Sequence, residues 1–316
     1  MKSGGRGIDQ NSDGAIAARE GDAATAPRLL QVNADAMVQN IADLMQLTRV
    51  VRAGLDVDGD GGVDLNADRI YYYGHSLGGM YGPGFVAYTP EVRAAFFLVP
   101  GAPLLENRRL SPTQRHQYGQ LLAGRTPSLL NSGNGLTSVG GVAVLPPFFN
   151  EGLPLRNEPP VVTPVPGAIA IQQFADWSTW IAQRGSPIGT VPRLRLRPPV
   201  GITPRPFLLG FARSDTASPN PNTSHIIRAG AFADRVAYYR HDRYWADNPT
   251  IPKNPHGFIA QLVPPSPAYA AIVRGAQAQI AEFFQSDGTT AIVPDPAAYW
   301  EFPIVSPLPE DMGYIP

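Results

Sequence analysis

The sequence predicts an α/β fold in which a mostly parallel sheet is flanked by helices. Its 316 residues suffice to bury a large core, and 43% of them are hydrophobic. Three short, unbroken apolar runs, at 70–73, 94–99 and 207–212, have the pattern of strands buried on both faces of a parallel sheet. Helical patterns lie before and after these runs, so strands and helices share one chain.

Composition excludes several classes of function. A formal net charge of -1 argues against a nucleic-acid partner, which needs a basic surface. No apolar run is long enough to cross a bilayer, and the amino end lacks the apolar stretch of a signal peptide. The sequence contains no cysteine, which excludes disulfides and thiolate chemistry. The oligomeric state cannot be derived from these features.

The first motif is an acidic loop at 9–20 that fits the calcium-loop pattern D-x-[DN]-x-[DN]-G-x5-E. Its oxygen ligands are Asp9, Asn11 and Asp13, with Glu20 closing the shell, and Gly14 permits the tight bend. No helix is expected before it, so it is not a complete helix-loop-helix hand. The pattern is compatible with a structural calcium ion and with a solvated acidic turn.

The first helix is expected from Asn33 to Ala53, with Asn33 as the amino-terminal cap and Gly54 as the stop. A second acidic loop follows directly at 56–64, beginning with Asp56 and Asp58. It carries Ala67 where a bidentate glutamate should stand, so calcium is less strongly indicated here, and a tight turn is the alternative.

The run 70–73 leads into Gly74-His75-Ser76-Leu77-Gly78, which matches G-x-S-x-G. Glycines on both sides of a serine allow a sharp turn from strand to helix that presents the hydroxyl at the carboxyl edge of the sheet. Because the pentapeptide follows an apolar strand, we interpret it as a nucleophile elbow rather than an ordinary glycine-rich turn. Gly82-Pro83-Gly84 predicts a kink or break in the helix that follows.

The segment 104–200 is rich in proline and glycine and separates two core strands. We interpret it as a cap inserted into a core formed by 1–103 and 201–316. Ser111-Pro112 opens one expected helix, and another lies between Gly167 and Gly185. The tryptophans of the second helix, Trp177 and Trp180, are assigned to the core of the cap, with stacking on a ligand as the alternative.

The remaining elements are a strand at 236–239, a final helix opened by Ser266 that runs to Phe284, and a proline-rich tail expected to lie extended on the surface.

A serine hydroxyl needs a base within hydrogen-bond reach and an acid that orients the base. After an elbow, these partners follow in the order acid, then histidine. Of the five histidines, His256 alone lies in a late loop between the last strand and the final helix. For the acid we favour Asp215, at the end of the strand 207–212, over its rivals Asp242 and Asp247.

The backbone N–H of Leu77 is the expected first donor to an oxyanion, because it follows the nucleophile at a helix amino terminus. The second donor normally comes from a loop after an earlier strand, and the sequence offers no such strand before Asn33.

Three motifs together, Gly74-His-Ser-Leu-Gly-Gly, the acidic loop at 56–66 and Asn254-Pro-His-Gly-Phe, resemble bacterial α/β-hydrolase-fold lipases and esterases, in particular the extracellular or envelope-associated lipases of virulence-factor type. The resemblance covers nearly the whole chain. It implies the α/β-hydrolase fold and the same roles for Ser76, Asp215 and His256. It also implies that the N-terminal strands and the oxyanion loop of the family are missing from this sequence, and it suggests an extracellular or envelope location.

These features predict a carboxylic-ester hydrolase that acts through an acyl-enzyme on hydrophobic esters, including polyesters. The triad chemistry requires no cofactor, so calcium would be structural only. The expected partner is a small-molecule or polymeric ester substrate. A serine peptidase or acyltransferase with the same triad is the alternative enzyme, and a catalytically inactive calcium-binding module is the alternative of another class.

Overall fold

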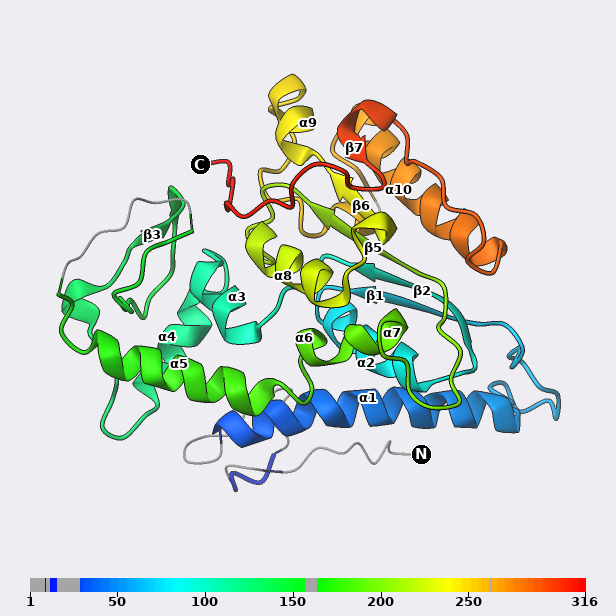
Figure 1. The fold of residues 1–316 in the computed structure, drawn as a ribbon, viewed down its shortest axis with the longest axis horizontal. Coiled ribbons are helices and arrows are strands. Elements are labelled where there is room, and N and C mark those ends of the chain that lie inside the picture. Colours follow the sequence, from blue (N-terminus) through cyan, green and yellow to red (C-terminus); the bar gives the residue numbers. More distant parts are fainter. Residues whose placement is uncertain (1–8, 10–11, 16–28, 157–163, 262) are drawn as a thin grey trace.

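The computed structural model describes residues 9, 12–15, 29–156, 164–261 and 263–316, with the backbone alone for 29–33. These residues form a mixed α/β structure around one five-stranded sheet in the order β1-β2-β5-β6-β7 (Figure 1). The first four strands of this order pair in parallel, and β7 is antiparallel to β6. The strands are β1 (Ile70–His75), β2 (Val92–Leu98), β5 (Phe207–Ala212), β6 (Val236–Tyr239) and β7 (Trp300–Glu301).

Helices cover both faces of this sheet (Figure 1). One layer contains α2, α6, α7 and α8, with α1 packed on the outside of α2; the other contains α9 and α10. Each layer buries its own apolar cluster against the sheet, because side chains alternate between the two faces along a strand. The bounds are α1 (Leu29–Ala53), α2 (Leu77–Tyr88), α6 (Pro187–Thr190), α7 (Pro192–Arg195), α8 (Asn220–Gly230), α9 (His241–Asp247) and α10 (Pro267–Gln285).

The segment 104–200 extends beyond the sheet on the left of Figure 1. It contains α3 (Leu104–Leu110), α4 (Arg115–Ala123), α5 (Ala168–Ala182) and a small hairpin of β3 (Ser138–Val139) and β4 (Val142–Ala143). The helices α3, α4 and α5 share an apolar cluster separate from the two that line the sheet. The same segment also contains a buried ionic group: Glu151 is 1% exposed and ion-paired with both Arg109 and Arg115.

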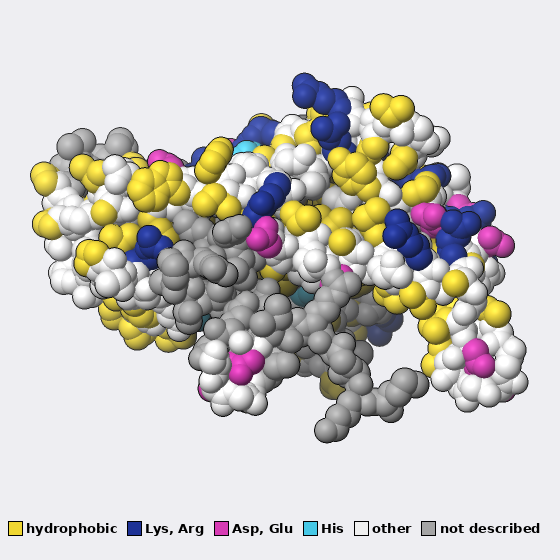
Figure 2. All heavy atoms as spheres, turned by 90° about the horizontal axis from the view of Figure 1, so that it is seen from below, with side chains coloured by type: hydrophobic (Ala, Val, Ile, Leu, Met, Phe, Trp, Pro, Cys, Tyr) yellow, Lys and Arg dark blue, Asp and Glu magenta, His cyan; other side chains and the backbone are white. Residues whose placement is uncertain are grey.

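Two expectations for this segment need correction. Its last helices, α6 and α7, pack with the sheet, since Val191 and Leu194 belong to the cluster beneath α2 and α8. The assignment of the tryptophans to a core is wrong, because Trp177 and Trp180 are 57% and 77% exposed. Figure 2 shows further hydrophobic side chains at this end of the molecule, left in both views.

The predicted strands at 70–73, 94–99, 207–212 and 236–239 are all present. The first helix begins at Leu29, four residues before the expected cap at Asn33. The tail does more than cross the surface: it supplies β7 and buries Met312 and Tyr314 against Leu110. Among the described residues, no helix has the length and apolar character needed to cross a membrane.

Of the kink or break expected at Gly82-Pro83-Gly84, the break is absent, since α2 continues through Pro83 to Tyr88. An interior proline costs about 3 kcal/mol in a helix. Burial offsets this cost, because eight residues of α2, Pro83 included, are buried. The glycines permit this packing rather than ending the helix, as a side chain at Gly84 would lie 2.5 Å from Cδ1 of Ile41.

The sheet register brings the loops that follow β1 and β5 to the carboxyl edge of the sheet. His75 at the end of β1 pairs with Leu98 of β2, and Leu98 pairs in turn with Gly210 of β5. The loops that follow β1 and β5 therefore leave the sheet at the same edge, one on each side of β2.

We predict that Gly82→Ala destabilises the fold through overpacking. The new Cβ would lie 2.4 Å from Cε1 of Tyr72 and 2.7 Å from Cε1 of Phe97, both on the strands beneath. Overpacking costs about 1–3 kcal/mol, and the better helix propensity of alanine returns at most about 1 kcal/mol of it. Urea unfolding measures the change in the free energy of unfolding.

The matched control is Gly133→Ala, because the added Cβ there meets no heavy atom within 4 Å. Its free energy of unfolding should change by no more than about 0.5 kcal/mol. Equal stability of both variants would contradict the close helix-strand contact.

Candidate active site

Ser76 occupies a sharp strand-to-helix turn. Its φ of 54° is in the left-handed region, which is unusual for a residue with a side chain. Its N–H donates to the carbonyl of Leu98 over 2.8 Å, and α2 begins at the next residue. A Cβ at Gly74 would lie 2.4 Å from the carbonyl oxygen of Gly78, so only glycine fits at this point. Gly74 therefore permits the close approach of the Gly78 carbonyl on which the turn depends.

The structure brings Ser76, His256 and Asp215 into one hydrogen-bonded chain. The distance from Nε2 of His256 to Oγ of Ser76 is 2.9 Å. On the other side of the ring, Nδ1 lies 2.8 Å and 3.1 Å from the two carboxylate oxygens of Asp215. Both contacts are within the range in which a base can accept the serine proton while an acid orients it.

The Asp215 carboxylate is held by the loop that follows β5. Its side chain is almost fully buried, and Oδ1 accepts hydrogen bonds of 2.8 Å from the N–H groups of Ala217 and Ser218. Ser214, directly before it, has a φ of 71° and donates its hydroxyl to the carbonyl of Gly313 over 2.6 Å. A buried carboxylate with this set of donors is held as an acceptor for Nδ1.

Two opposed effects act on the pKa of His256. Burial of the ring lowers it, whereas the charge of Asp215 and the hydrogen bond to that carboxylate raise it, and the net direction is upward. Because a carboxylate can only accept, Nδ1 carries the proton in the neutral ring. The lone pair of Nε2 therefore faces the serine hydroxyl.

Two further side chains contact the main chain of His256. The ring of His75 places Nε2 2.9 Å from the carbonyl oxygen of His256. Oδ1 of Asn254 accepts from the N–H of His256 over 3.1 Å and from the N–H of Thr216 over 3.2 Å. Sequence reasoning missed both contacts, because it used His75 and Asn254 only as parts of motifs.

The rival residues lie elsewhere. Asp242 is paired with Arg240, and Asp247 accepts the hydroxyl of Tyr299. His225 lies within α8, and His241 is fully buried beside the hydroxyl of Tyr239. His116 lies on α4, which is beyond the sheet on the left of Figure 1.

Leu77 is the first residue of α2, so its backbone N–H has no acceptor within the helix. Its role as an oxyanion donor stays a prediction. The side chain of Leu77 is 47% exposed, and that of Tyr73 on β1 is 43% exposed. Apolar surface thus lies open to solvent at the residue directly after the serine and on β1.

The first acidic loop is described only in part. The carboxylate of Asp9 accepts from the N–H groups of Asp13 and Gly14, whereas Asn11 and Glu20 lie outside the described residues. The calcium site at Asp9, Asn11, Asp13 and Glu20 therefore stays a prediction.

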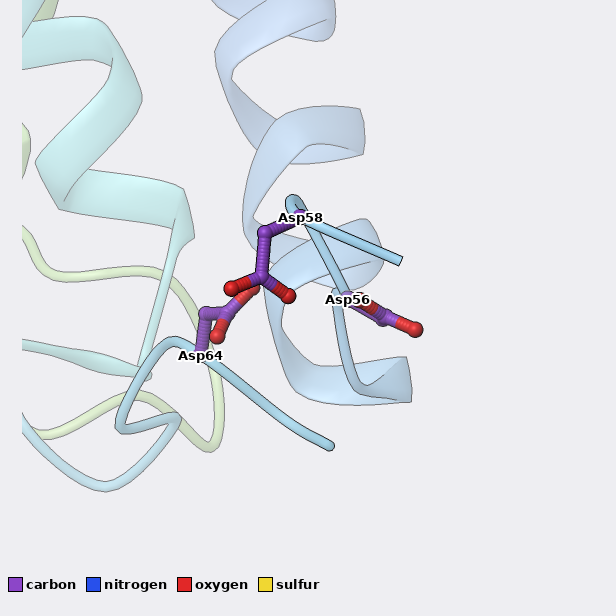
Figure 3. A group of neighbouring side chains, drawn as sticks. All are labelled: Asp56, Asp58 and Asp64. Carbon is purple, nitrogen blue, oxygen red and sulfur yellow. The ribbon is translucent and has the colours of Figure 1, made fainter. Parts of the chain in front are cut away.

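The second acidic loop brings three exposed carboxylates together. Asp56, Asp58 and Asp64 each offer an oxygen within 4.8 Å of the other two, and Figure 3 shows the carboxylates of Asp58 and Asp64 side by side. Asp56 accepts from the N–H groups of Gly59 and Gly61, which shapes the loop. Oxygen ligands at this spacing suit calcium, but exposed acidic turns also occur without an ion.

Comparison with protein-family models and with curated proteins finds no match for this chain. Its function is therefore inferred from the geometry of the site.

We predict that the pKa of His256 lies above its ordinary value of 6.5 and falls below that value in Asp215→Asn, where burial of the ring remains and the negative charge is lost. An NMR titration of the imidazole protons, assigned with His256→Gln, measures both midpoints. A titration midpoint unchanged by Asp215→Asn would contradict the coupling.

Stability should follow the same coupling. Because the folded pKa is raised, the stabilisation from this pair is fully present below pH 6.5 and is lost as the pH rises through the folded pKa. Asp215→Asn should reverse the sign of this pH dependence, because the folded pKa then lies below 6.5 and the free energy of unfolding rises with pH.

We also predict that calcium at millimolar concentration raises the Tm, because an ion relieves the repulsion among Asp56, Asp58 and Asp64. Asp58→Asn should reduce the shift, and sodium chloride of equal ionic strength is the control. An undiminished shift in Asp58→Asn would assign the ion to the loop at Asp9, and no shift in the wild type would exclude both sites.

Proposed function

We propose that this protein is a serine hydrolase of carboxylic esters that works through an acyl-enzyme. The observation that supports it is the hydrogen-bonded chain from Ser76 through His256 to Asp215 at the carboxyl edge of a parallel sheet. The residues follow along the chain in the order serine, acid, histidine, which is the order of enzymes with a nucleophile elbow.

In the proposed reaction, Nε2 of His256 takes the proton of Ser76 as Oγ attacks the ester carbonyl carbon. The C–O bond to the alcohol breaks, and His256 gives that proton to the leaving alcohol. Water then attacks the acyl-enzyme with the same proton transfers and releases the acid. Asp215 holds the ring and stabilises the imidazolium, and the N–H of Leu77 stabilises the oxyanion.

We propose an α/β-hydrolase architecture in which the part of 104–200 that precedes α6 acts as a cap, because α6 and α7 pack with the sheet. The supporting contacts lie where this segment meets the loop of the acid. Asn107 donates to the carbonyl of Ala217 over 2.8 Å, and the hydroxyl of Ser111 donates to the carbonyl of Thr216 over 2.6 Å. The segment is therefore fastened next to Asp215.

Hydrophobic esters, including polyesters, are the substrate class that the surface favours. Leu77, directly after the nucleophile, and Tyr73, on β1, expose apolar surface, as do Trp177 and Trp180 on α5. Such surface favours apolar acyl chains over charged groups. The same triad serves peptide hydrolysis and acyl transfer, so the test below includes both.

The decisive experiment is labelling with a fluorophosphonate probe together with hydrolysis of a nitrophenyl ester. The wild type should be labelled and should turn the ester over. Ser76→Ala should lose the label and reduce turnover by on the order of 10⁴-fold or more.

Ser224→Ala is the matched control, because the hydroxyl of Ser224, on α8, donates a hydrogen bond to the carbonyl of Pro309. This variant should be labelled as strongly as the wild type. Faster turnover of a peptide amide than of the ester would identify a serine peptidase instead of an ester hydrolase. Transfer of the acyl group to an alcohol in place of water would identify an acyltransferase. Neither label nor turnover in the wild type would favour a catalytically inactive module.

A further inference from the structure

The proposed base lies on a loop, between α9 and the short 3-10 helix Phe258–Ala260. The hydrogen bond from Nδ1 to Asp215 orients the ring, but it does not fix the main chain that carries the ring. Catalysis depends on placement to within a few tenths of an ångström. The loop therefore needs further contacts to the two other loops of the site.

One of these contacts comes from the elbow itself. A carbonyl oxygen only accepts, so Nε2 of His75 must carry the proton in its bond to the carbonyl of His256. The two imidazole rings have their centroids 5.2 Å apart. Burial lowers the pKa of His75, which favours a neutral donor. A neutral donor holds the loop without opposing the positive charge that His256 acquires during the reaction.

The other contact comes from Asn254 and joins two loops through one atom. Its Oδ1 accepts from the N–H of His256, on the loop of the base, and from the N–H of Thr216, on the loop of the acid. Both partners are donors, which fixes the orientation of the amide. The distance between the main chains next to Asp215 and His256 is thus set by a single side chain.

We propose that His75 and Asn254 are positioning residues that hold the main chain of His256 between the loop of Ser76 and the loop of Asp215. Each of the three loops is then bonded to a neighbour by a contact independent of the triad side chains. The effect of these two residues on catalysis rests on the proposed function, whereas their effect on the position of the loop does not. His75, the residue before the serine in the G-x-S-x-G motif, accordingly has the role of holding the main chain of His256.

The test compares His75→Phe with His75→Gln. Phenylalanine keeps the ring volume but cannot donate, whereas the amide nitrogen of glutamine reaches about as far as Nε2 of histidine. We expect His75→Phe to lower kcat on a soluble nitrophenyl ester by roughly 10- to 100-fold with little change in KM, because misplacement of a catalytic group acts on the chemical step. His75→Gln should recover most of the loss.

Amide hydrogen exchange of the peptide 252–260, followed by mass spectrometry, gives a readout that needs no activity. Exchange should be faster than in the wild type in His75→Phe and close to the wild type in His75→Gln. His225→Phe, on α8 and outside the site, is the matched control and should change neither kcat nor exchange in this peptide.

Asn254 provides a second pair of variants should His75→Phe fail to fold. Asn254→Ala removes the acceptor, whereas Asn254→Asp retains an oxygen at the same position. Exchange of both peptides, 214–218 and 252–260, should rise in Asn254→Ala and stay close to the wild type in Asn254→Asp.

The outcomes separate the two proposals. An inactive wild type whose exchange still responds to His75→Phe and Asn254→Ala would end the proposed function and keep the positioning contacts. An active wild type in which these variants change neither kcat nor exchange would overturn the positioning role. A fall in kcat that His75→Gln does not recover, without faster exchange, would also overturn it.

Discussion

The buried hydrogen bond between the Asp215 carboxylate and Nδ1 of His256 is the constraint on which the site depends. A carboxylate that is 1% exposed has lost its hydration, so every oxygen must find a donor within the protein. The loop after β5 supplies the N–H groups of Ala217 and Ser218, and the imidazole supplies the remaining donor. The acid and the base are thereby fixed together, although 41 residues separate them along the chain.

Close packing at the elbow sets the other half of the geometry. Ser76 can lie within 2.9 Å of His256 only if α2 begins directly at the end of β1. That start requires the carbonyl of Gly78 to pass where a side chain at position 74 would stand. The hydroxyl of Tyr72 accommodates this by donating to the same carbonyl over 2.6 Å. The arrangement of the proposed triad and the packing of the elbow thus depend on the same set of contacts.

Much of the fold and of the candidate site could be predicted from the sequence, because the patterns that specify them lie within short segments of the chain. The apolar runs that form β2 and β5 are buried as expected, and the G-x-S-x-G motif carries its own turn. The run that forms β1 was expected to be buried on both faces, but β1 lies at the end of the sheet and is mostly half-buried. His256 and Asp215 followed from their positions after strands. What failed depends on contacts distant in sequence: the strand β7 exists through pairing with β6, and α2 passes through Pro83 because its surroundings bury it. The contacts of His75 and Asn254 with the loop of the base likewise exist only once the loops are assembled.

The carboxyl-terminal tail is attached to two parts of the molecule at once. Gly313 accepts the hydroxyl of Ser214, next to the acid, while the hydroxyl of Tyr314 donates to the carbonyl of Leu110 in α3 over 2.8 Å. The tail therefore links the loop that follows β5 to α3 through hydrogen bonds. Proteolytic loss of these few residues would consequently loosen the neighbourhood of Asp215 while leaving every triad side chain in the protein.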